Sequence, residues 1–582
     1  MCNSLSIIML KLGANSYSKI AIAGIVCISL ILIYFFRWSG GAYRFVIAGD
    51  GNDYYSYLVS VFINKNLTHQ DISHWYVMQT PTGTINAHPP GVSLLLLPFF
   101  FIGYVWAYLS HAPLDGLSKP FQAMVSIGAL FYFTTGLVYL RKLLAVFTNK
   151  DKIIALVIVL IFFGTNLMIY ALDEPSMSHI YSFALITAFL YYIHRIFHQP
   201  FKRHLYFAGI ILGLIILVRP VNAIIFMVVP FFANSLDDCL LRIKKLFRQW
   251  KTLVIPTLFF FMVASIQSII WFVQNGKIIQ WSLRGRGFYF NHPQTWLMLF
   301  GFDSGFFIYT PLCFLILLGL LPLFYQNKFR FLILAIFIAF AFYLFSCYWS
   351  YNYYDGLGIR TFVDFYSLFA ILLTILLVYL ANKKIKYAAF ILIAGAFLLN
   401  LVYCYQYQAN IMLHSGMTFK KYKYIFLKTD KSYANVLGGS IDLQPYSTEA
   451  PKLIYSYAQY DPISFNNVEY GLNNKIQLNF PTNELYVKIR FKRKEETPNS
   501  SFNAYIVVQI ESDKGEIKRY EPHRLNDVPT QNSGLWEDMH YEISAISQAS
   551  LPTDKLSIYI WNQDKKNFAV GDYSLEVYNY IY

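Results

Sequence analysis

Long apolar runs alternate with short polar segments along roughly the first 425 residues of the chain. A helix needs about 20 apolar residues to cross the hydrocarbon core of a membrane, and most of these runs approach that length. The expected spans are residues 20–36, 121–140, 153–171, 178–197, 205–218, 221–234, 252–273, 295–325, 331–347, 361–381 and 387–405. This pattern predicts a polytopic α-helical membrane protein with about eleven spans.

Basic residues set the expected orientation of these spans. Lys11 and Lys19 precede the first span, and residues 241–251 hold the densest group of lysines and arginines. Basic loops face the cytoplasm, so we expect a cytoplasmic N-terminus and an external C-terminal region in the cell (inner) membrane. The alternation then leaves one apolar stretch that does not cross. We expect it to be 91–110, which contains Pro98, lying along or dipping into the outer interface.

The hydrophobic pattern changes from about residue 430 onward. Residues 485–491 and 556–560 alternate apolar and polar side chains with the period of two that is typical of strands. Turn signals such as 513–515 separate these segments. We therefore predict an external antiparallel β-sandwich over residues 430–582. It follows a membrane domain over residues 1–425, whose first external loop covers 37–90.

Composition supports a membrane protein and excludes two other classes. Hydrophobic residues make up 56% of the chain and charged residues 14%, with a mean hydropathy of +0.42, which is too apolar for a soluble protein of this length. The net charge of +15 comes mostly from loops between apolar runs, so it follows the positive-inside pattern and does not indicate nucleic acid. The six cysteines show no CxxC spacing, which argues against zinc and a disulfide framework.

The strongest candidate for chemistry is the polar segment 49–57, shortly after the first span. It carries Asp50 and Asp53 beside glycines and tyrosines. A carboxylate held at a membrane surface can act as a general base or bind a metal ion. The alternative is structural, because Asp also favours the N-cap of a helix, here one beginning near Asn52.

Other unusual polar groups fall on the same predicted external side. Besides Asp50 and Asp53 these are His88, Asp173, Glu174, His179, Arg219, Arg284, Arg286, His292, Asp303 and residues 349–360. Each has a structural alternative: arginines can snorkel to lipid phosphates, and the aromatic residues of 348–354 can belong to an interfacial aromatic belt. Their gathering on one face still favours a functional site there.

Several of these segments resemble the GT-C membrane glycosyltransferases, a superfamily that includes protein mannosyltransferases and lipid A aminoarabinose transferases. The resemblance covers about residues 20–425 and rests on 50–51, 54–58, His88-Pro89-Pro90, 164–167, 174–179, 305–311 and 356–360, followed by an external β-domain. One departure is that the adjacent acidic pair of the family is split here into Asp50 and Asp53. That split leaves the role of Asp53 open.

The resemblance implies a specific chemistry. Such enzymes transfer a sugar from a polyprenyl phosphate to an acceptor at the outer leaflet, with inversion. Asp50 would be the catalytic base, and Arg284, Arg286 and Arg360 would hold the donor phosphate. Asp53, His88, Glu174 and His179 would contact substrate. The site is expected to be metal-free; the alternative is a divalent cation held by Asp50, Asp53 and Glu174.

Two other functions remain open from the sequence. One is an oligosaccharide ligase or polymerase that uses a diphosphate-linked donor. The other is a lipid or sugar transporter. The clustering of the polar groups on one face argues against transport, because carriers tend to bind their substrates near mid-span. The expected partners are a polyprenyl-phosphate sugar, membrane lipids, and a lipid, glycan or protein acceptor from the cell envelope. Nucleic acid is not expected.

Overall fold

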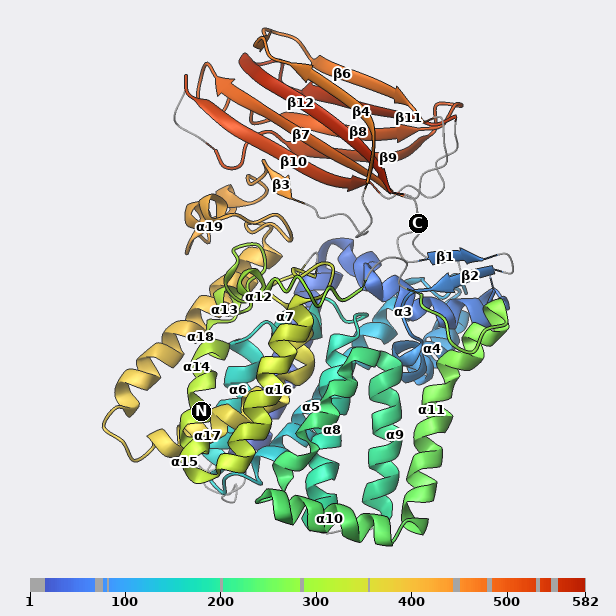
Figure 1. The fold of residues 1–582 in the computed structure, drawn as a ribbon, viewed down its shortest axis with the longest axis vertical. Coiled ribbons are helices and arrows are strands. Elements are labelled where there is room, and N and C mark those ends of the chain that lie inside the picture. Colours follow the sequence, from blue (N-terminus) through green and yellow to red (C-terminus); the bar gives the residue numbers. More distant parts are fainter. Residues whose placement is uncertain are drawn as a thin grey trace.

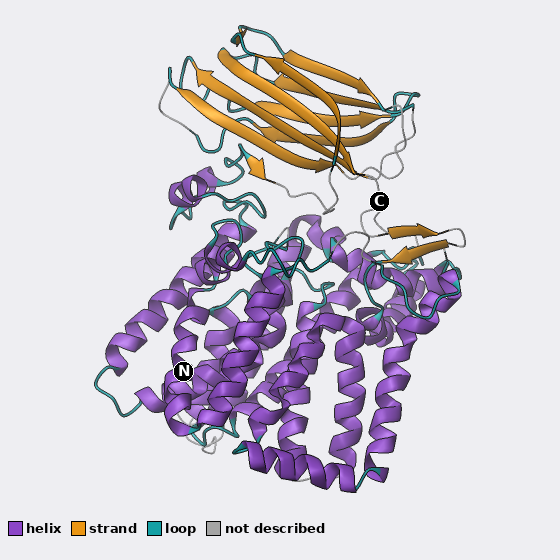
Figure 2. Ribbon diagram, in the orientation of Figure 1, coloured by secondary structure: helices purple, strands orange, loops and turns teal. Residues whose placement is uncertain are grey.

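The computed structural model describes residues 16–68, 77–80, 83–198, 202–282, 287–353, 356–442, 451–478, 484–529, 534–545 and 553–580. Figure 1 shows a large helical part and, above one end of it, a layered β-structure. Figure 2 shows the same division by secondary structure, with one small β-hairpin of β1 (Val77–Thr80) and β2 (Gly83–Asn86) beside the helices. A polytopic helical domain followed by a β-domain is therefore the fold class that the sequence predicted.

Among the described residues, eight helices are long and apolar enough to cross a membrane, or nine if one bent pair forms a single span. They are Tyr17–Trp38 (α2 with η1), α4 (Gly91–Leu109), α5 (Lys119–Leu144), α8 (His179–His198), α11 (Lys251–Asn275), α16 (Lys328–Ser346), Arg360–Leu380 (η7 with α17) and α18 (Lys386–Gln408). The bent pair is η5 (Pro220–Phe232) with α10 (Leu236–Arg248).

Broken and short helices explain why this number is lower than the expected eleven. The run 153–171 is divided into α6 (Asp151–Phe163) and α7 (Leu167–Leu172). The run 295–325 becomes α12 (Thr295–Phe300), α13 (Phe306–Tyr309) and the helix Pro311–Gln326, in which η6 (Leu317–Gly319) joins α14 (Pro311–Ile316) to α15 (Leu320–Gln326). The run 205–218 forms α9 (Lys202–Val218), of 17 residues. An apolar run thus predicts how long a stretch of the chain is buried. Where the helix within it breaks depends on glycine, proline and polar residues.

The basic segment expected as a loop is largely helical. α10 bends by 108° from η5, and Figure 1 shows it across the end of the helical part farthest from the β-domain. The Ser235 side chain accepts a hydrogen bond from the Asp238 amide at 3.2 Å, which caps the helix. Lys245 and Arg248 lie in its last turn, where they complement the helix dipole. These local signals account for a helix where charge alone suggested a loop.

The stretch expected to lie at the interface forms one continuous helix, α4, despite Pro98. It is long enough to cross a membrane, so its length does not separate it from the other spans. Figure 1 places α4 beside α3 (Asp50–Leu58), in the upper part of the helical domain near the β-hairpin. Its orientation relative to a membrane stays a prediction.

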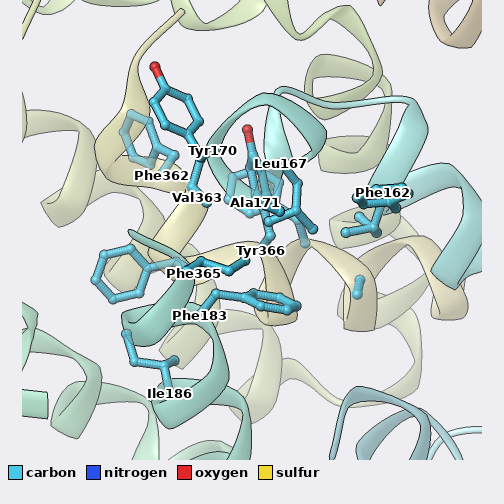
Figure 3. Close-up of a cluster of buried hydrophobic side chains, with 14 of the residues drawn as sticks. Phe162, Leu167, Tyr170, Ala171, Phe183, Ile186, Phe362, Val363, Phe365 and Tyr366 are labelled. Carbon is cyan, nitrogen blue, oxygen red and sulfur yellow. The ribbon is translucent and has the colours of Figure 1, made fainter. Parts of the chain in front are cut away.

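A dense apolar core lies beneath the region where the polar clusters meet. Figure 3 shows Phe162, Tyr170, Phe183, Phe362 and Tyr366 gathered there from α6, α7, α8, η7 (Arg360–Phe365) and α17 (Tyr366–Leu380). All five side chains are nearly inaccessible to solvent. Because cores of this density do not deform easily, the residues at the start of η7 are anchored to a rigid base.

The C-terminal β-domain is a sandwich of two sheets. One has the order β3-β10-β7-β12-β4, with β5 also on β12, and the other β6-β11-β8-β9. The bounds are β3 Ile441–Asp442, β4 Lys452–Gln459, β5 Ile463–Phe465, β6 Tyr470–Gln477, β7 Glu484–Glu495, β8 Ala504–Glu511, β9 Ile517–Arg524, β10 Trp536–Ala545, β11 Lys555–Asn562 and β12 Phe568–Tyr580. The eight long strands follow the order of a jelly roll. All pairs are antiparallel except β3 with β10.

We expect the contact between α3 and the loop at residues 173–178 to depend on Gly51. A Cβ at Gly51 would lie 1.9 Å from the Ser176 Oγ and 2.5 Å from its Cβ, so Gly51→Ala must push the two segments apart. Overpacking of this kind costs about 1–3 kcal/mol, measured as a fall in thermal stability of the purified protein.

Gly24→Ala is the matched control, because a Cβ at Gly24 meets nothing within 4 Å. Adding Ser176→Gly to Gly51→Ala should restore part of the stability. Equal stability of Gly51→Ala and Gly24→Ala would show that the close approach is not needed.

Candidate active site

A cavity of about 530 Å³ is lined by residues from α3, α8, α11 and α16, among others. Figure 1 shows α3 at the end of the helical domain that faces the β-sandwich. Its ionisable lining residues are Asp50, His88, His179, Arg219 and Arg360. The remaining wall is mostly apolar and aromatic, including Trp271, Ile279, Trp281, Phe288, Leu344, Phe345, Tyr348, Trp349 and Tyr353. The cavity therefore combines a charged end with an apolar body. Such a site suits a ligand with an ionic head and an apolar chain.

Asp50 is the first residue of α3, and its carboxylate faces this cavity. The preceding residue, Gly49, is the N-cap, with a φ of 56° that favours glycine. Arg360 donates to the Asp50 Oδ2 at 2.7 Å. Burial alone would raise the pKa of Asp50, but Arg360, helped by His88, His179 and Arg219, lowers that pKa to about 2. The alternative reading of Asp50 as a helix cap is therefore wrong.

Asp53 and His88 form a second acid–base pair next to Asp50. The His88 Nδ1 lies 3.0 Å from the Asp53 Oδ2. Asp53 has no solvent exposure and does not line the cavity, whereas His88 does. The substrate contact expected of Asp53 stays a prediction. Its carboxylate orients the His88 ring toward the cavity.

The local backbone explains how this pair is placed. The Asn86 Nδ2 donates to the Asp53 carbonyl at 2.8 Å, and the His88 amide donates to the Asn86 Oδ1 at 2.8 Å. The Tyr57 hydroxyl donates to the His88 carbonyl at 2.6 Å. These bonds hold the segment after β2 against α3. Asp50 and Asp53, both on α3, can therefore pair with different residues, Arg360 and His88.

A third cluster is centred on Asp364, which the sequence analysis did not single out. Its Oδ1 lies 2.8 Å from the His179 Nδ1, and its Oδ2 accepts from Arg219 at 3.0 Å and from Asn222 at 2.8 Å. Asp364 is fully buried. A carboxylate inside the apolar run 361–381 was the available signal, because ionisable residues within spans are costly and usually functional.

Arg360 is held in place by segments that are distant in sequence. The Asn166 Nδ2 donates to the Leu357 carbonyl at 2.7 Å, and the Tyr366 hydroxyl donates to the Asn166 Oδ1. Gly358 has a φ of +67°, and a Cβ there would lie 3.3 Å from the Tyr309 Cβ. The segments 164–167, 305–311 and 356–360, noted in the sequence separately, therefore meet to position one arginine.

Glu174 lies beside the cavity but does not line it. It accepts a hydrogen bond from the Tyr407 hydroxyl at 3.0 Å, while the neighbouring Asp173 pairs with Arg37 at 2.7 Å. Burial raises the pKa of Glu174 to about 7, against the opposing effect of Arg360. The substrate contact expected of Glu174 stays a prediction, and the raised pKa places its change of protonation near neutral pH.

Two predicted phosphate ligands, Arg284 and Arg286, lie outside the described residues. The flanking Ser282 and Phe288 both line the cavity. Of the aromatic residues at 348–354, Trp349 is 5% and Tyr353 7% exposed, and both line the cavity wall. The interpretation of these two as part of an interfacial belt is therefore wrong, since a belt residue faces lipid headgroups.

The carboxylates proposed as an alternative cation site do not converge. In the part of the chain that the structure describes, no group of three or more His, Cys, Asp or Glu side chains is arranged to hold a metal ion. Asp50 pairs with Arg360 and Asp53 with His88, while Glu174 is bonded to Tyr407. Asp50, Asp53 and Glu174 therefore do not form the cation site considered as the alternative.

Comparisons with known proteins give likeness in structure but none in sequence. No family model matches the chain, and no curated protein matches its sequence. ArnT from Cupriavidus metallidurans, whose crystal structure was solved with undecaprenyl phosphate bound, is similar with a TM-score of 0.39 and 11% identity. The match covers 67% of this chain and 66% of the ArnT chain. Similarity at this level does not carry the activity of ArnT over to this chain.

We expect Glu174 to make stability depend on pH. Its pKa in the folded protein, about 7, lies above the ordinary value of 4.5, so the folded state binds a proton that the unfolded state releases between these values. Stability from this proton is present at low pH and lost as pH rises toward 7. Relative to Glu174→Gln, the wild type should lose about 1–3 kcal/mol between about pH 5 and pH 8.

Thermal unfolding of both proteins across this range measures the effect, with the exposed Glu516→Gln as control. Parallel stability curves for wild type and Glu174→Gln would contradict the raised pKa.

We also expect Asp364 and Arg219 to be coupled. Removing one partner of a buried ion pair leaves the other charge unpaired, at a cost of about 3–5 kcal/mol. Asp364→Asn and Arg219→Gln should each lower thermal stability, and the double variant should lose clearly less than the sum. Additive losses in this double-mutant cycle would argue against the pair.

Proposed function

We propose that this protein is a GT-C-type inverting glycosyltransferase that moves a sugar from a polyprenyl-phosphate donor to an acceptor hydroxyl. We place the reaction at the outer face of the cell membrane, with the β-sandwich on the same side. The observation that carries the proposal is the single cavity in which Asp50 meets Arg360, Arg219, His179 and His88 at one end of an otherwise apolar wall.

The two ends of the cavity match the two parts of such a donor. Arg360 and Arg219 supply the positive charge that a phosphate needs, and arginine binds phosphate oxygens in a bidentate manner. The apolar wall includes Trp271 on α11, the least buried of the candidate spans. Ile279 and Trp281, which follow α11, line the cavity and are themselves largely exposed. A lipid chain can therefore leave the cavity beside α11.

The proposed step uses Asp50 as the base. Its carboxylate takes the proton of the acceptor hydroxyl while that oxygen attacks the anomeric carbon from the face opposite the phosphate. The bond between the anomeric carbon and the phosphate oxygen breaks, and its electrons stay on the lipid phosphate. Arg360 and Arg219 stabilise the charge that develops there, so the leaving group needs no general acid.

The ion pair between Asp50 and Arg360 implies that the donor binds before Asp50 acts as a base. While Arg360 is on Asp50, it keeps the pKa of Asp50 near 2 and the carboxylate is a weak base. A donor phosphate competes for the same guanidinium. Once Arg360 turns to the phosphate, Asp50 loses its strongest counter-charge and becomes more basic. Donor binding thus prepares the base.

Purified protein supplied with a panel of polyprenyl-phosphate sugars, a parallel panel of diphosphate-linked donors and a membrane extract as acceptor tests the proposal. We expect release of free polyprenyl phosphate that requires acceptor and falls at least about a hundredfold in Asp50→Asn, because a general base contributes that much or more. Asp237→Asn, on the exposed surface of α10, is the matched control and should leave release unchanged.

Two results would contradict the proposal. One is release that persists in folded Asp50→Asn protein. The other is release only from diphosphate-linked donors, which would identify a ligase or polymerase.

A further inference from the structure

The two sheets of the jelly roll present different outer faces. On the β10-β7-β12 face, most side chains are charged, with ion pairs such as Lys492 to Asp572 at 2.9 Å, and the rings of Tyr486, Tyr578 and Trp536 lie beneath lysines. On the β6-β11-β8-β9 face, aromatic rings occupy several of the positions between the inward-facing residues. Charged side chains are usual on a sheet face that contacts water. A row of aromatic side chains on such a face often marks a binding site.

Strand register places three of these rings side by side. Trp561 on β11 is opposite Tyr470 on β6 and opposite Tyr505 on β8, and Tyr505 is opposite Arg524 on β9. The row therefore crosses all four strands of the sheet. Tyr559 on β11 and Tyr520 on β9 lie on the same face, one and two rows away. We call these five aromatic residues the aromatic row.

The rings lie over the sheet and cover it. The Tyr505 and Trp561 ring centroids are 5.8 Å apart with 33° between their planes. The Tyr470 and Tyr559 centroids are 6.0 Å apart. Val507, which shares this face between the rings, has no solvent exposure. Tyr470 and Tyr520 themselves are 53% and 43% exposed, so part of the aromatic surface is open.

Polar groups border the aromatic row. The Tyr559 hydroxyl donates to the Gln509 Oε1 at 3.0 Å, and the Gln509 Nε2 donates to the Glu511 Oε2 at 3.1 Å. At the opposite end, the Arg524 guanidinium lies 5.9 Å from the Tyr505 ring centroid. Flat apolar surfaces with hydrogen-bonding groups at their edges are the pattern of a site for an amphipathic ligand.

We propose that the aromatic row is a binding surface for a pyranose glycan chain. A pyranose ring has an apolar face of C–H groups, which packs on an aromatic ring, and hydroxyls around its edge, which hydrogen-bond to polar neighbours. The 5.8 Å between the Tyr505 and Trp561 centroids is comparable to the length of one sugar unit in an extended chain. Two successive sugars can therefore meet these two rings.

The position of the aromatic row connects it to the helical domain. The Arg524 Nη1 donates to the Asn435 carbonyl at 2.8 Å, and the Gly439 amide donates to the Arg524 carbonyl at 2.8 Å. Residues 435–439 belong to the segment between α18 and β3 that joins the two parts of the chain. A glycan bound along the row would thus have one end at this junction. This inference does not depend on the proposed transferase activity.

The full-length protein in detergent tests the inference without any donor. The probes are three hexasaccharides, β-1,4-linked glucose, β-1,4-linked N-acetylglucosamine and α-1,6-linked mannose, with binding followed by tryptophan fluorescence and by titration calorimetry. We expect at least one of them to bind. Trp561→Ala and Tyr505→Ala should each weaken that binding about tenfold or more, while Trp561→Phe should keep most of it.

Tyr460→Ala is the matched control, because Tyr460 is 77% exposed directly after β4 of the other sheet and lies outside the aromatic row. It should bind the sugar as the wild type does. Thermal unfolding shows whether each variant is folded. The inference is overturned if no hexasaccharide binds the wild type at millimolar concentration, or if folded Trp561→Ala and Tyr505→Ala bind as well as Tyr460→Ala. It is also overturned if loss of Trp561 only changes self-association of the chain.

Discussion

The ion pair between Asp50 and Arg360 joins two residues that are 310 positions apart, and much of the structure serves to hold its two ends. Asp50 is fixed because Gly51 lets α3 sit directly against Ser176. Arg360 is fixed because Asn166 holds the Leu357 carbonyl, while Tyr366, in the core of Figure 3, holds Asn166. In the proposed function Asp50 is the base, and a base and its counter-charge need a well-defined geometry, which rigid packing provides here from both sides.

The three acid clusters of the site differ in what surrounds them. Asp50 is open to the cavity, Asp53 is enclosed behind His88, and Asp364 is enclosed behind His179 and Arg219. An enclosed carboxylate cannot reach a substrate, but it can fix the ring or guanidinium that does. This is the common division between groups that do chemistry and groups that orient them. The site therefore has one candidate base and two sets of supporting residues.

The alternation of apolar runs predicted which polar residues of this site lie on the same side of the helical domain. Polar residues after apolar runs on one face of a membrane must gather in one layer, and Asp50, His88, His179 and Arg360 do so. Pairing was not predictable in this way. Which carboxylate meets which arginine depends on how helices pack, and Asp364 gave only the weak signal of one acid in an apolar run.

The fold shows the same limit. Period-two alternation predicted a β-sandwich, yet it does not specify that β12 pairs with both β4 and β7. Apolar length predicted the helical domain, but it could not reveal that the run 295–325 is broken into α12, α13 and the helix Pro311–Gln326. Strand order and helix breaks depend on contacts between residues far apart in sequence, which local patterns do not record.

The sparse packing of α11 has a consequence for how a lipid ligand reaches the cavity. This helix exposes side chains such as Leu258, Phe261 and Phe272 along its length, while its Trp271 lines the cavity. A ligand that arrives past α11 comes from the bilayer and not from water. The occupancy of the cavity then depends on the mole fraction of this ligand among the surrounding lipids. Dilution of the aqueous phase would leave occupancy unchanged, whereas dilution with other lipids would lower it.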